Sequence, residues 1–341
     1  MKKVLSAILA FLAVVAMIVI AIFYTRLTTS AVLPPNGENT FSLYIPTGAD
    51  FEQVKDSLYL NNIITKPKTF EIWTSLRKYP DHVKPGHYLL KKGMSVDKLC
   101  AMLKGGLQTP VKVTFNNMRN VDMLAGRVGE QIEADSASIA NYLNDLQNLS
   151  ELGFTRQTIP AMFLPNTYEF YWNSSAEQFV QKMKKEYDNY WNEERRNKAL
   201  ALGLTPVQVS TLASIVDKET NKTDEMARIA GVYINRLKSG WLLQADPTLV
   251  FAVGDFGLKR VLNVHKEVES PYNTYKYPGL PPGPICIPSL ASINAVLNAE
   301  KHNYYYFCAK DDFSGYHVFA KTLSEHNRNA DRYQRALNRV L

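Results

Sequence analysis

The chain has 341 residues and a formal net charge of +7, with 39 basic and 32 acidic side chains. That length allows two or three domains, each with its own core. A basic balance would favour nucleic acid in a cytosolic protein, but the N-terminus indicates export, so we expect anionic lipid or wall polymer and no nucleic acid. The three cysteines are an odd number without a C-x-x-C pair, which favours small core residues over disulfides: Cys100, Cys286 and Cys308.

An uninterrupted apolar run, Val4–Tyr24, follows two lysines and precedes Arg26. It is long enough to cross a bilayer as one helix. A cleaved signal peptide is the alternative, but its apolar region would be shorter, and residues 27–33 offer no clear small-x-small cleavage site. The N-terminal lysines favour a cytoplasmic N-terminus. We therefore expect residues 1–27 to be a single-pass anchor in the cytoplasmic (inner) membrane, with the remainder extracytoplasmic or periplasmic.

Residues 28–40 contain turn formers and no apolar period, so they predict a linker. Beyond them a short β-type run, a turn and an amphipathic helix recur weakly. We expect small modules at 41–110, of a kind that commonly binds rather than catalyses, and a second module with a helical connector at 111–200. Within that connector, Gln181–Lys198 has the spacing of one helix with a solvated face. The three expected strands begin the copies at Phe41, His87 and Val111.

The segment 201–341 carries the candidate chemistry. Thr205–Gln208 predicts a helix start, because Thr is a cap, Pro suits the first turn and Gln closes a capping box. At 100° per residue, Glu219 falls near the middle of the apolar stripe of this helix, and Asp217 points almost the opposite way. A carboxylate on the buried face is desolvated, which raises its pKa toward the range of a general acid. Alternatively, Glu219 ends the helix and reaches water. The stripe consists of Val209, Leu212, Ile215 and Val216.

Four elements follow. A second helix should begin near Asp224, with Met226, Ala230, Tyr233 and Leu237 as its apolar positions. Gln244–Thr248 crowds an amide, a carboxylate and a hydroxyl around a proline, although a plain turn gives the same residues. The loop Pro271–Pro284 mixes prolines, tyrosines and amides, as sugar-binding surfaces do, although it could be purely architectural. Asn303–Ala309 and Tyr316–Lys321 predict a hairpin before a last helix.

Two other chemistries are disfavoured. His317 and His326 could ligate a metal, but no H-E-x-x-H or comparable spacing occurs, so we expect neither a metal nor a cofactor. Ser95–Lys98 and Ser292–Asn294 match parts of the penicillin-binding pattern, but its Lys-Thr-Gly element appears only as Lys321–Leu323. We interpret that match as chance.

Four motifs together resemble the endolytic murein transglycosylase family, MltG or YceG-like. They are Leu212–Thr220, Gln244–Thr248, Tyr272–Tyr275 and Gly279–Pro284. The resemblance covers nearly everything after residue 40. It departs from the family at Asp217, where many relatives carry Glu, and around residues 159–166, where an acidic-Gly pair is absent. Shorter matches lie at His317–Phe319, His326–Asn327 and, more weakly, Leu164–Tyr168.

The resemblance implies an α+β chain with a single transmembrane helix, small LysM-like α/β modules and a C-terminal α+β catalytic domain containing a glycan groove. Glu219 matches the family's catalytic glutamate, which protonates the glycosidic oxygen between MurNAc and GlcNAc and then deprotonates the MurNAc 6-hydroxyl. The products would be 1,6-anhydroMurNAc ends that terminate glycan elongation. One carboxylate suffices because the internal hydroxyl replaces the water or enzyme nucleophile of a hydrolysing glycosidase.

The same resemblance implies peptidoglycan strands as substrate and peptidoglycan synthases, the penicillin-binding proteins, as partners. Asp246 is either a second carboxylate, which would permit hydrolysis by a muramidase, or a brace for its loop, which we favour. A non-catalytic wall-binding or division scaffold is the alternative from another class. The expected substrate-binding residues are Gln244, Asp246, Thr248, Tyr272, Asn273, Tyr275, His317 and Asn327.

Overall fold

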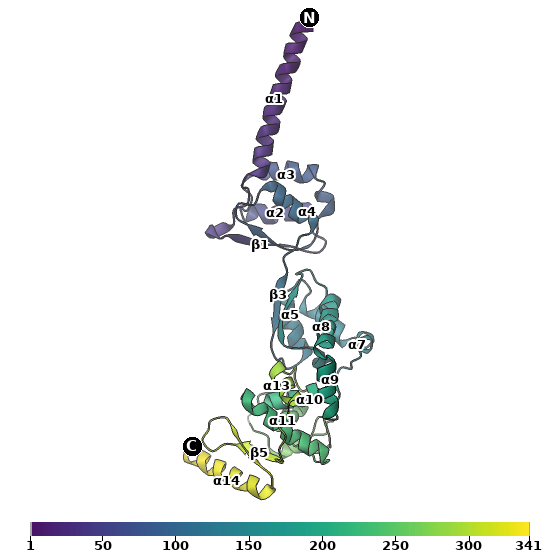
Figure 1. Cartoon of the computed structure of the whole chain (residues 1–341), viewed down its shortest axis with the longest axis vertical. Coiled ribbons are helices and arrows are strands. Elements are labelled where there is room, and N and C mark those ends of the chain that lie inside the picture. The colour runs from purple at the N-terminus through teal and green to yellow at the C-terminus, as the bar shows by residue number, and fades with distance from the viewer. Residues whose placement is uncertain (1, 259, 341) are drawn as a thin grey trace. The chain divides into compact units, whose positions relative to one another are not determined.

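The computed structural model describes residues 2–258 and 260–340 and combines helices with small two-stranded sheets (Figure 1). The mixed α+β class expected from the sequence is therefore confirmed. The chain divides into two compact units. Unit 1 comprises the chain up to Val113 with Gln131–Ala134 and Glu169–Ser175, and unit 2 comprises the remainder.

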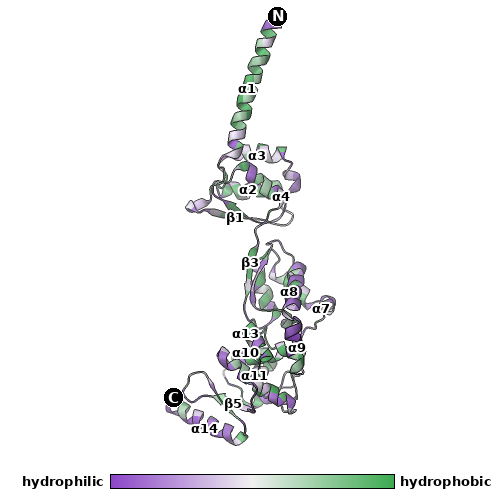
Figure 2. Ribbon diagram, in the orientation of Figure 1, coloured by the Kyte–Doolittle hydropathy of each residue, from purple (hydrophilic) through white to green (hydrophobic). Residues whose placement is uncertain are grey.

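Unit 1 begins with one long helix, α1 (Lys2–Thr28), whose residues are hydrophobic along nearly its whole length (Figure 2). Its 27 residues correspond to roughly 40 Å at 1.5 Å per residue, enough to cross a bilayer. The side chains of its apolar run are exposed, with Phe11 at 68% and Ile20 at 66%. This helix fits a single-pass anchor.

The rest of unit 1 is built on one antiparallel strand pair. Strands β1 and β2 place Leu43 opposite Tyr88, and both side chains enter the core. The strands expected to open the first two repeat copies therefore pair with each other, so those copies form one module. Asp50 and Ser95 cap the helices that follow the strands. The elements are β1 (Thr40–Ile45), α2 (Phe51–Leu60), α3 (Pro67–Leu76), η2 (Pro80–His82), β2 (Gly86–Lys91) and α4 (Val96–Gly105).

The expected linker differs from its prediction. After α1 the chain is held within unit 1, because Ala31 and Val32 are buried and the backbone N–H groups of both donate to the Met94 carbonyl. The Thr65 N–H in turn donates to the Ala31 carbonyl at 2.9 Å. Only the short turn η1 (Pro35–Gly37) and its neighbours match the exposed connection that the turn-forming residues predicted.

Strand β3 (Val111–Phe115) pairs with β4 (Asn166–Phe170), and the residues of both strands are divided between the two units. The third predicted strand and its helix are thus observed. The single helix expected over Gln181–Lys198 is instead two helices, because Asn192 caps the second one through the Arg195 N–H. The helices of this region are α5 (Val121–Gly129), α6 (Ser136–Asn144), α7 (Leu146–Leu152), η3 (Ile159–Met162), α8 (Ala176–Tyr190) and α9 (Glu193–Ala201).

The C-terminal part of unit 2 is organised around α10, which packs against α11, α12 and α13. The predicted hairpin is observed with shorter strands, and the last helix packs along it (Figure 1). The loop between α12 and α13 packs closely against the backbone at Gln157, just before η3. A Cβ on Gly283 would lie 2.0 Å from the Gln157 carbonyl oxygen. The elements are α10 (Pro206–Glu219), α11 (Thr223–Lys238), α12 (Asp246–Val253), η4 (Asn263–Glu267), α13 (Leu290–Leu297), β5 (Tyr306–Ala309), β6 (His317–Ala320) and α14 (Leu323–Val340).

Candidate active site

Helix α10 begins and ends sharply. The Thr205 hydroxyl accepts from the Gln208 N–H at 3.2 Å, and the Gln208 side chain accepts from the Thr205 N–H at 2.8 Å, which is the predicted capping box. At the other end Thr220 turns to an extended backbone, with φ −149° and ψ 146°. Glu219 is therefore the last helical residue, and its position is fixed by a well-ended helix.

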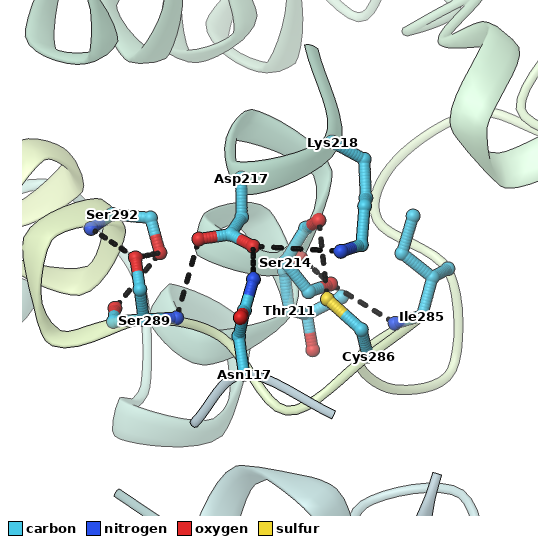
Figure 3. Close-up of polar contacts among 9 residues, drawn as sticks. All are labelled: Asn117, Thr211, Ser214, Asp217, Lys218, Ile285, Cys286, Ser289 and Ser292. Atoms are coloured by element: carbon cyan, nitrogen blue, oxygen red, sulfur yellow. Dashed lines mark hydrogen bonds and ion pairs between the residues drawn. The ribbon is translucent and has the colours of Figure 1, made fainter. Parts of the chain in front are cut away.

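The helix is buried on all sides rather than on one stripe. Every residue from Val209 to Asp217 is buried. Its buried hydroxyls differ in their contacts. The Ser214 hydroxyl donates to the Thr211 carbonyl at 2.7 Å and accepts from the Ile285 N–H at 2.9 Å (Figure 3), whereas the Ser210 hydroxyl has no hydrogen-bond partner among the described residues. The hydrogen bond to Ile285 links α10 to residues 285–289, the segment after the proline-rich loop, which we call the strap.

Asp217 is enclosed by donors. Its carboxylate accepts from the Asn117 amide at 2.9 Å and from the Ser289 N–H at 3.3 Å, and it lies 3.7 Å from the Lys218 ammonium (Figure 3). The helical spacing predicts that Asp217 points almost the opposite way from Glu219; in the structure Asp217 is buried in the interior, with 8% of the residue exposed. Asp217 thus links α10 to the β3–α5 loop and the start of α13.

Glu219 is only partly buried, and one of its oxygens accepts a short hydrogen bond from the Tyr233 hydroxyl on α11. No second hydrogen bond to this carboxylate is seen among residues 2–258 and 260–340. Burial raises the pKa of Glu219 to about 7; the Tyr233 hydrogen bond and the Arg236 charge oppose that rise, and the Asp246 charge adds to it. A carboxyl group with this pKa can both donate and accept a proton near neutral pH.

Tyr233 and Arg236 form the buried back of the site. Tyr233 is 1% exposed, and burial together with Glu219 raises the pKa of its hydroxyl well above the usual range, so it stays a proton donor. The Arg236 guanidinium donates to the Tyr305 and Leu243 carbonyls at 2.7 and 2.5 Å. A buried cation held by neutral carbonyls keeps its positive field available to Glu219.

Asp246 brings a second carboxylate to the same cleft. It is the first residue of α12, is exposed, and accepts from the Tyr275 hydroxyl at 2.6 Å. Burial and the Asp246 hydrogen bond raise the pKa of Tyr275, so this hydroxyl also remains a donor. The pair joins the Gln244–Thr248 segment to the Tyr272–Tyr275 segment, two of the motifs singled out in the sequence.

The cleft has a volume of about 900 Å³ and is lined by both carboxylates. Its walls mix amides, cations and apolar side chains, and the Arg119 guanidinium lies 4.0 Å from the centre of the Phe256 ring. Glu219 and Lys218 also line a second cavity of about 380 Å³ beside residues 313–315.

Burial raises the pKa of the Cys286 thiol at the larger cleft to about 12, so this side chain offers no thiolate nucleophile. The polar lining of the larger cleft is Asn116, Asn117, Arg119, Lys218, Glu219, Asp246 and Arg260.

The other expected binding residues are scattered. Thr248 and Asn273 are fully buried: the Thr248 hydroxyl bonds to the Ala245 carbonyl and to the Thr274 hydroxyl, and the Asn273 amide donates to the Lys266 and Val268 carbonyls. Both therefore brace loops. Gln244 is exposed with φ +50° and does not line the cleft described above.

Tyr272 contacts the cleft indirectly, since its ring lies 4.6 Å from that of Phe251, which lines it. His317 is held elsewhere: its Nδ1 lies 2.6 Å from a carboxylate oxygen of the buried Glu225. Asn327 is exposed on α14. Neither His317 nor Asn327 lines either cavity that contains Glu219.

Sequence reasoning missed Tyr233, Arg236 and the polar loop Asn116–Arg119. Tyr233 was interpreted only as an apolar position, although a buried hydroxyl needs a hydrogen-bond partner, and that requirement was the available signal. Arg236 lies off the apolar stripe of α11, and nothing in the sequence indicates that it is buried or which groups it contacts. The loop lies in the third repeat copy, where no chemistry was expected, and only its run of amides marked it.

Comparison with known proteins gives a consistent picture. The sequence profile of the YceG-like family matches residues 43–332. An endolytic murein transglycosylase of Bacillus subtilis is 28% identical over 318 residues, covering 87% of this chain and 86% of that protein. One from Streptococcus pneumoniae is 28% identical over 331 residues, covering 86% of this chain but only 58% of that protein. The chain thus spans little more than half of the pneumococcal relative.

A solved structure shares the fold. The crystal structure of a protein described as YceG-like, from Listeria monocytogenes, superposes with a TM-score of 0.56 and 27% sequence identity. The match covers 85% of this chain and 98% of that one. Both kinds of comparison therefore extend through most of the described chain and are not confined to one unit.

Proposed function

This chain belongs to the YceG-like family, and we propose that it is a membrane-anchored lytic transglycosylase that cleaves peptidoglycan strands internally. The observation that carries the proposal is Glu219, a partly buried carboxyl group with a pKa of about 7 at the point where a cleft meets a buried tyrosine. The names of the relatives from Bacillus subtilis and Streptococcus pneumoniae support murein as the substrate.

In the first step, protonated Glu219 donates its proton to the glycosidic oxygen between MurNAc and GlcNAc. The C1–O bond of MurNAc breaks, the GlcNAc hydroxyl leaves, and positive charge develops at C1. Because Tyr233 occupies one carboxyl oxygen, the other remains for the substrate. The burial that raises the pKa of Glu219 keeps a large fraction of it protonated near neutral pH, where an exposed glutamic acid would be almost fully ionised and could not donate a proton.

In the second step, the Glu219 carboxylate takes the proton of the MurNAc 6-hydroxyl, and that oxygen bonds to C1. The product is a 1,6-anhydroMurNAc end, no water is consumed, and Glu219 is protonated again. The Tyr233 hydrogen bond and the Arg236 charge stabilise the carboxylate formed between the steps. One carboxyl group therefore serves as acid and then as base.

Asp246 favours a second candidate, hydrolysis by a muramidase, because it places another carboxylate in the cleft. In that reaction water would attack C1 and give a reducing end. We favour a supporting role, since the Tyr275 hydroxyl already binds Asp246 and its charge raises the pKa of Glu219. Under either reaction its negative charge would stabilise the cation-like sugar.

The remaining proposals concern binding and location. We assign glycan contacts to Asp246 and, around it, to Tyr275, Tyr272 and Gln244, while Thr248 and Asn273 would act by holding the loops. Contacts from His317 and Asn327 would need a strand that extends beyond the larger cleft. The LysM-like region at 41–110 would bind glycan, and α1 would hold the enzyme at the outer face of the cytoplasmic membrane, beside peptidoglycan synthases.

Product analysis tests the proposal. The full chain is incubated with peptidoglycan strands, and the released muropeptides are identified by mass spectrometry. Anhydro ends are expected. Reducing ends would establish hydrolysis and make Asp246 a catalytic residue, and binding without any new ends would establish a scaffold instead of an enzyme.

A further inference from the structure

The most informative surface outside the catalytic cleft is on α3, in unit 1. At 100° per residue, Lys68, Ile72, Ser75 and Leu76 fall on one side of this helix, and all four are exposed. Two of them are large apolar side chains, with Ile72 52% and Leu76 66% exposed. We call these four residues the α3 face. Phe70 and Thr74 fill the opposite side and are fully buried.

Single exposed apolar residues are common on protein surfaces. These two are informative because α3 lies next to the end of α1. Figure 1 shows α3 beside the C-terminal end of α1, with β1 farther from that end. The centres of the Trp73 and Phe23 rings lie 6.2 Å apart, and Phe23 belongs to the apolar run of α1. The Lys66 ammonium donates to the Arg26 carbonyl at 3.3 Å and also contacts the Thr29 hydroxyl. The last turns of the spanning helix are therefore in direct contact with α3.

Trp73 has an apolar contact on one side and polar contacts on the other. Its ring meets Phe23 on one side, and its indole N–H donates to the Asp97 carboxylate at 3.0 Å. The Arg77 guanidinium lies 4.7 Å from the ring centre and also pairs with Asp97. Tryptophan is enriched where hydrocarbon gives way to head groups, because one end of the ring is apolar and the other is a donor.

Charge supports the same occupant. Arg77 is paired with Asp97, but Lys68 and Lys78 are exposed, and Lys66 at the start of α3 contacts the Arg26 carbonyl near the end of α1. Glu71 is the one acidic residue of α3, and it accepts from the Tyr59 hydroxyl at 3.1 Å. A basic surface with protruding apolar side chains matches an anionic lipid leaflet.

We propose that the α3 face rests on the outer leaflet of the membrane that α1 crosses, with Ile72 and Leu76 inserted among the head groups and the lysines on lipid phosphates. The inference rests on α1 spanning a membrane and not on catalysis by Glu219. Its consequence is that unit 1 does not swing freely on its anchor, since two contacts fix its tilt: the helix end and the α3 face.

The full chain in nanodiscs tests this. An environment-sensitive fluorophore is attached at Ser75→Cys, in a Cys308→Ser background because Cys308 is the one native cysteine that is not fully buried. A probe at Thr40→Cys, at the start of β1, serves as the control. In phosphatidylglycerol discs, emission at position 75 should be blue-shifted and quenched several-fold more by nitroxide lipids than emission at position 40. Equal, weak quenching at both positions would overturn the proposal.

A matched pair of variants sharpens the test. Ile72→Gln with Leu76→Gln should reduce the quenching at position 75, whereas Leu107→Gln, which removes another apolar side chain of unit 1 exposed at 66%, should not. Lys68→Gln should weaken the preference for phosphatidylglycerol over phosphatidylcholine. A blue shift at position 75 that appears only when two chains share one disc would assign the α3 face to contact with a second copy and refute the lipid contact. Glu219→Gln should leave the quenching unchanged, which separates this inference from the proposed activity.

Discussion

The two carboxylates at the end of α10 sit two residues apart and have opposite surroundings. Asp217 is the more buried, yet an amide, a backbone N–H and a lysine surround it. Glu219 is more open and meets one tyrosine hydroxyl, beside a cleft that holds another carboxylate. Depth alone therefore does not mark the reactive group. The number of donors that already satisfy the carboxylate distinguishes a structural acid from a chemical one.

The largest expected effect is a loss of activity when Glu219, the more open of the two carboxylates, is replaced. Glu219→Gln removes the group that takes part in both proton transfers of the proposed mechanism, and activity should fall by about 10³-fold, within the range of general acid–base catalysis. Release of muropeptides measured by mass spectrometry reports the loss, and an unchanged or raised melting temperature shows that the fold is intact. Cleavage at a near-normal rate would remove Glu219 from the mechanism.

Asp217→Ala should reverse the pattern, with a loss in stability rather than chemistry. It leaves the Asn117 amide, the Ser289 N–H and the Lys218 ammonium without their acceptor, and the free energy of unfolding should fall by about 3 kcal/mol. Denaturant unfolding measures this. Activity per folded molecule should fall far less than in Glu219→Gln; a comparable loss would show that the two carboxylates act together.

The stability of the wild type should depend on pH through Glu219. Its pKa is about 7 in the folded chain against an ordinary value of 4.5, so the folded state holds the proton more tightly. This contribution is complete below pH 4.5 and is lost as the pH rises through 7, by up to about 3 kcal/mol. The free energy of unfolding of Glu219→Gln minus that of the wild type should therefore increase between pH 5 and pH 8. A flat difference would mean that Glu219 titrates normally.

The smallest effect is expected at Tyr233→Phe. The lost hydrogen bond stabilises the carboxylate, so its removal should raise the pKa of Glu219 by about one unit. If the acid form starts the reaction, the alkaline fall of the pH–rate profile should move to higher pH by the same amount. Tyr275→Phe is the matched control, because the Tyr275 hydroxyl binds Asp246 and not Glu219. It should shift the alkaline fall of the pH–rate profile less.

Local signals explain what the sequence predicted well. The Thr205–Gln208 capping box, the apolar spacing of α11 and the alternation around residues 306–320 act over a few residues, and each element was found within a few residues of its expected ends. The family resemblance depends on short motifs of the same local kind. Glu219 was chosen from its place on the helix, and its assignment as the catalytic group remains a prediction.

Long-range contacts explain the rest. The pairing of β1 with β2 and the packing of Ala31 and Val32 join segments that carry no mark of each other in the sequence. Helical spacing identified one buried side of α10, but it could not show that α13 and the strap at residues 285–289 cover the other. For the same reason Asn273 and Thr248 were expected to face a ligand, whereas their hydrogen bonds run to neighbouring loops.

The enclosure of α10 also bears on how the protein fails when it is heated. Sites carried on loops often lose activity before the fold melts, because loops open at little cost, whereas fully packed helices open only with the whole domain. Glu219 stands on a helix whose residues 209–217 are all buried. Heat inactivation should therefore follow the melting of unit 2 in a single transition, with no temperature range in which folded protein is inactive.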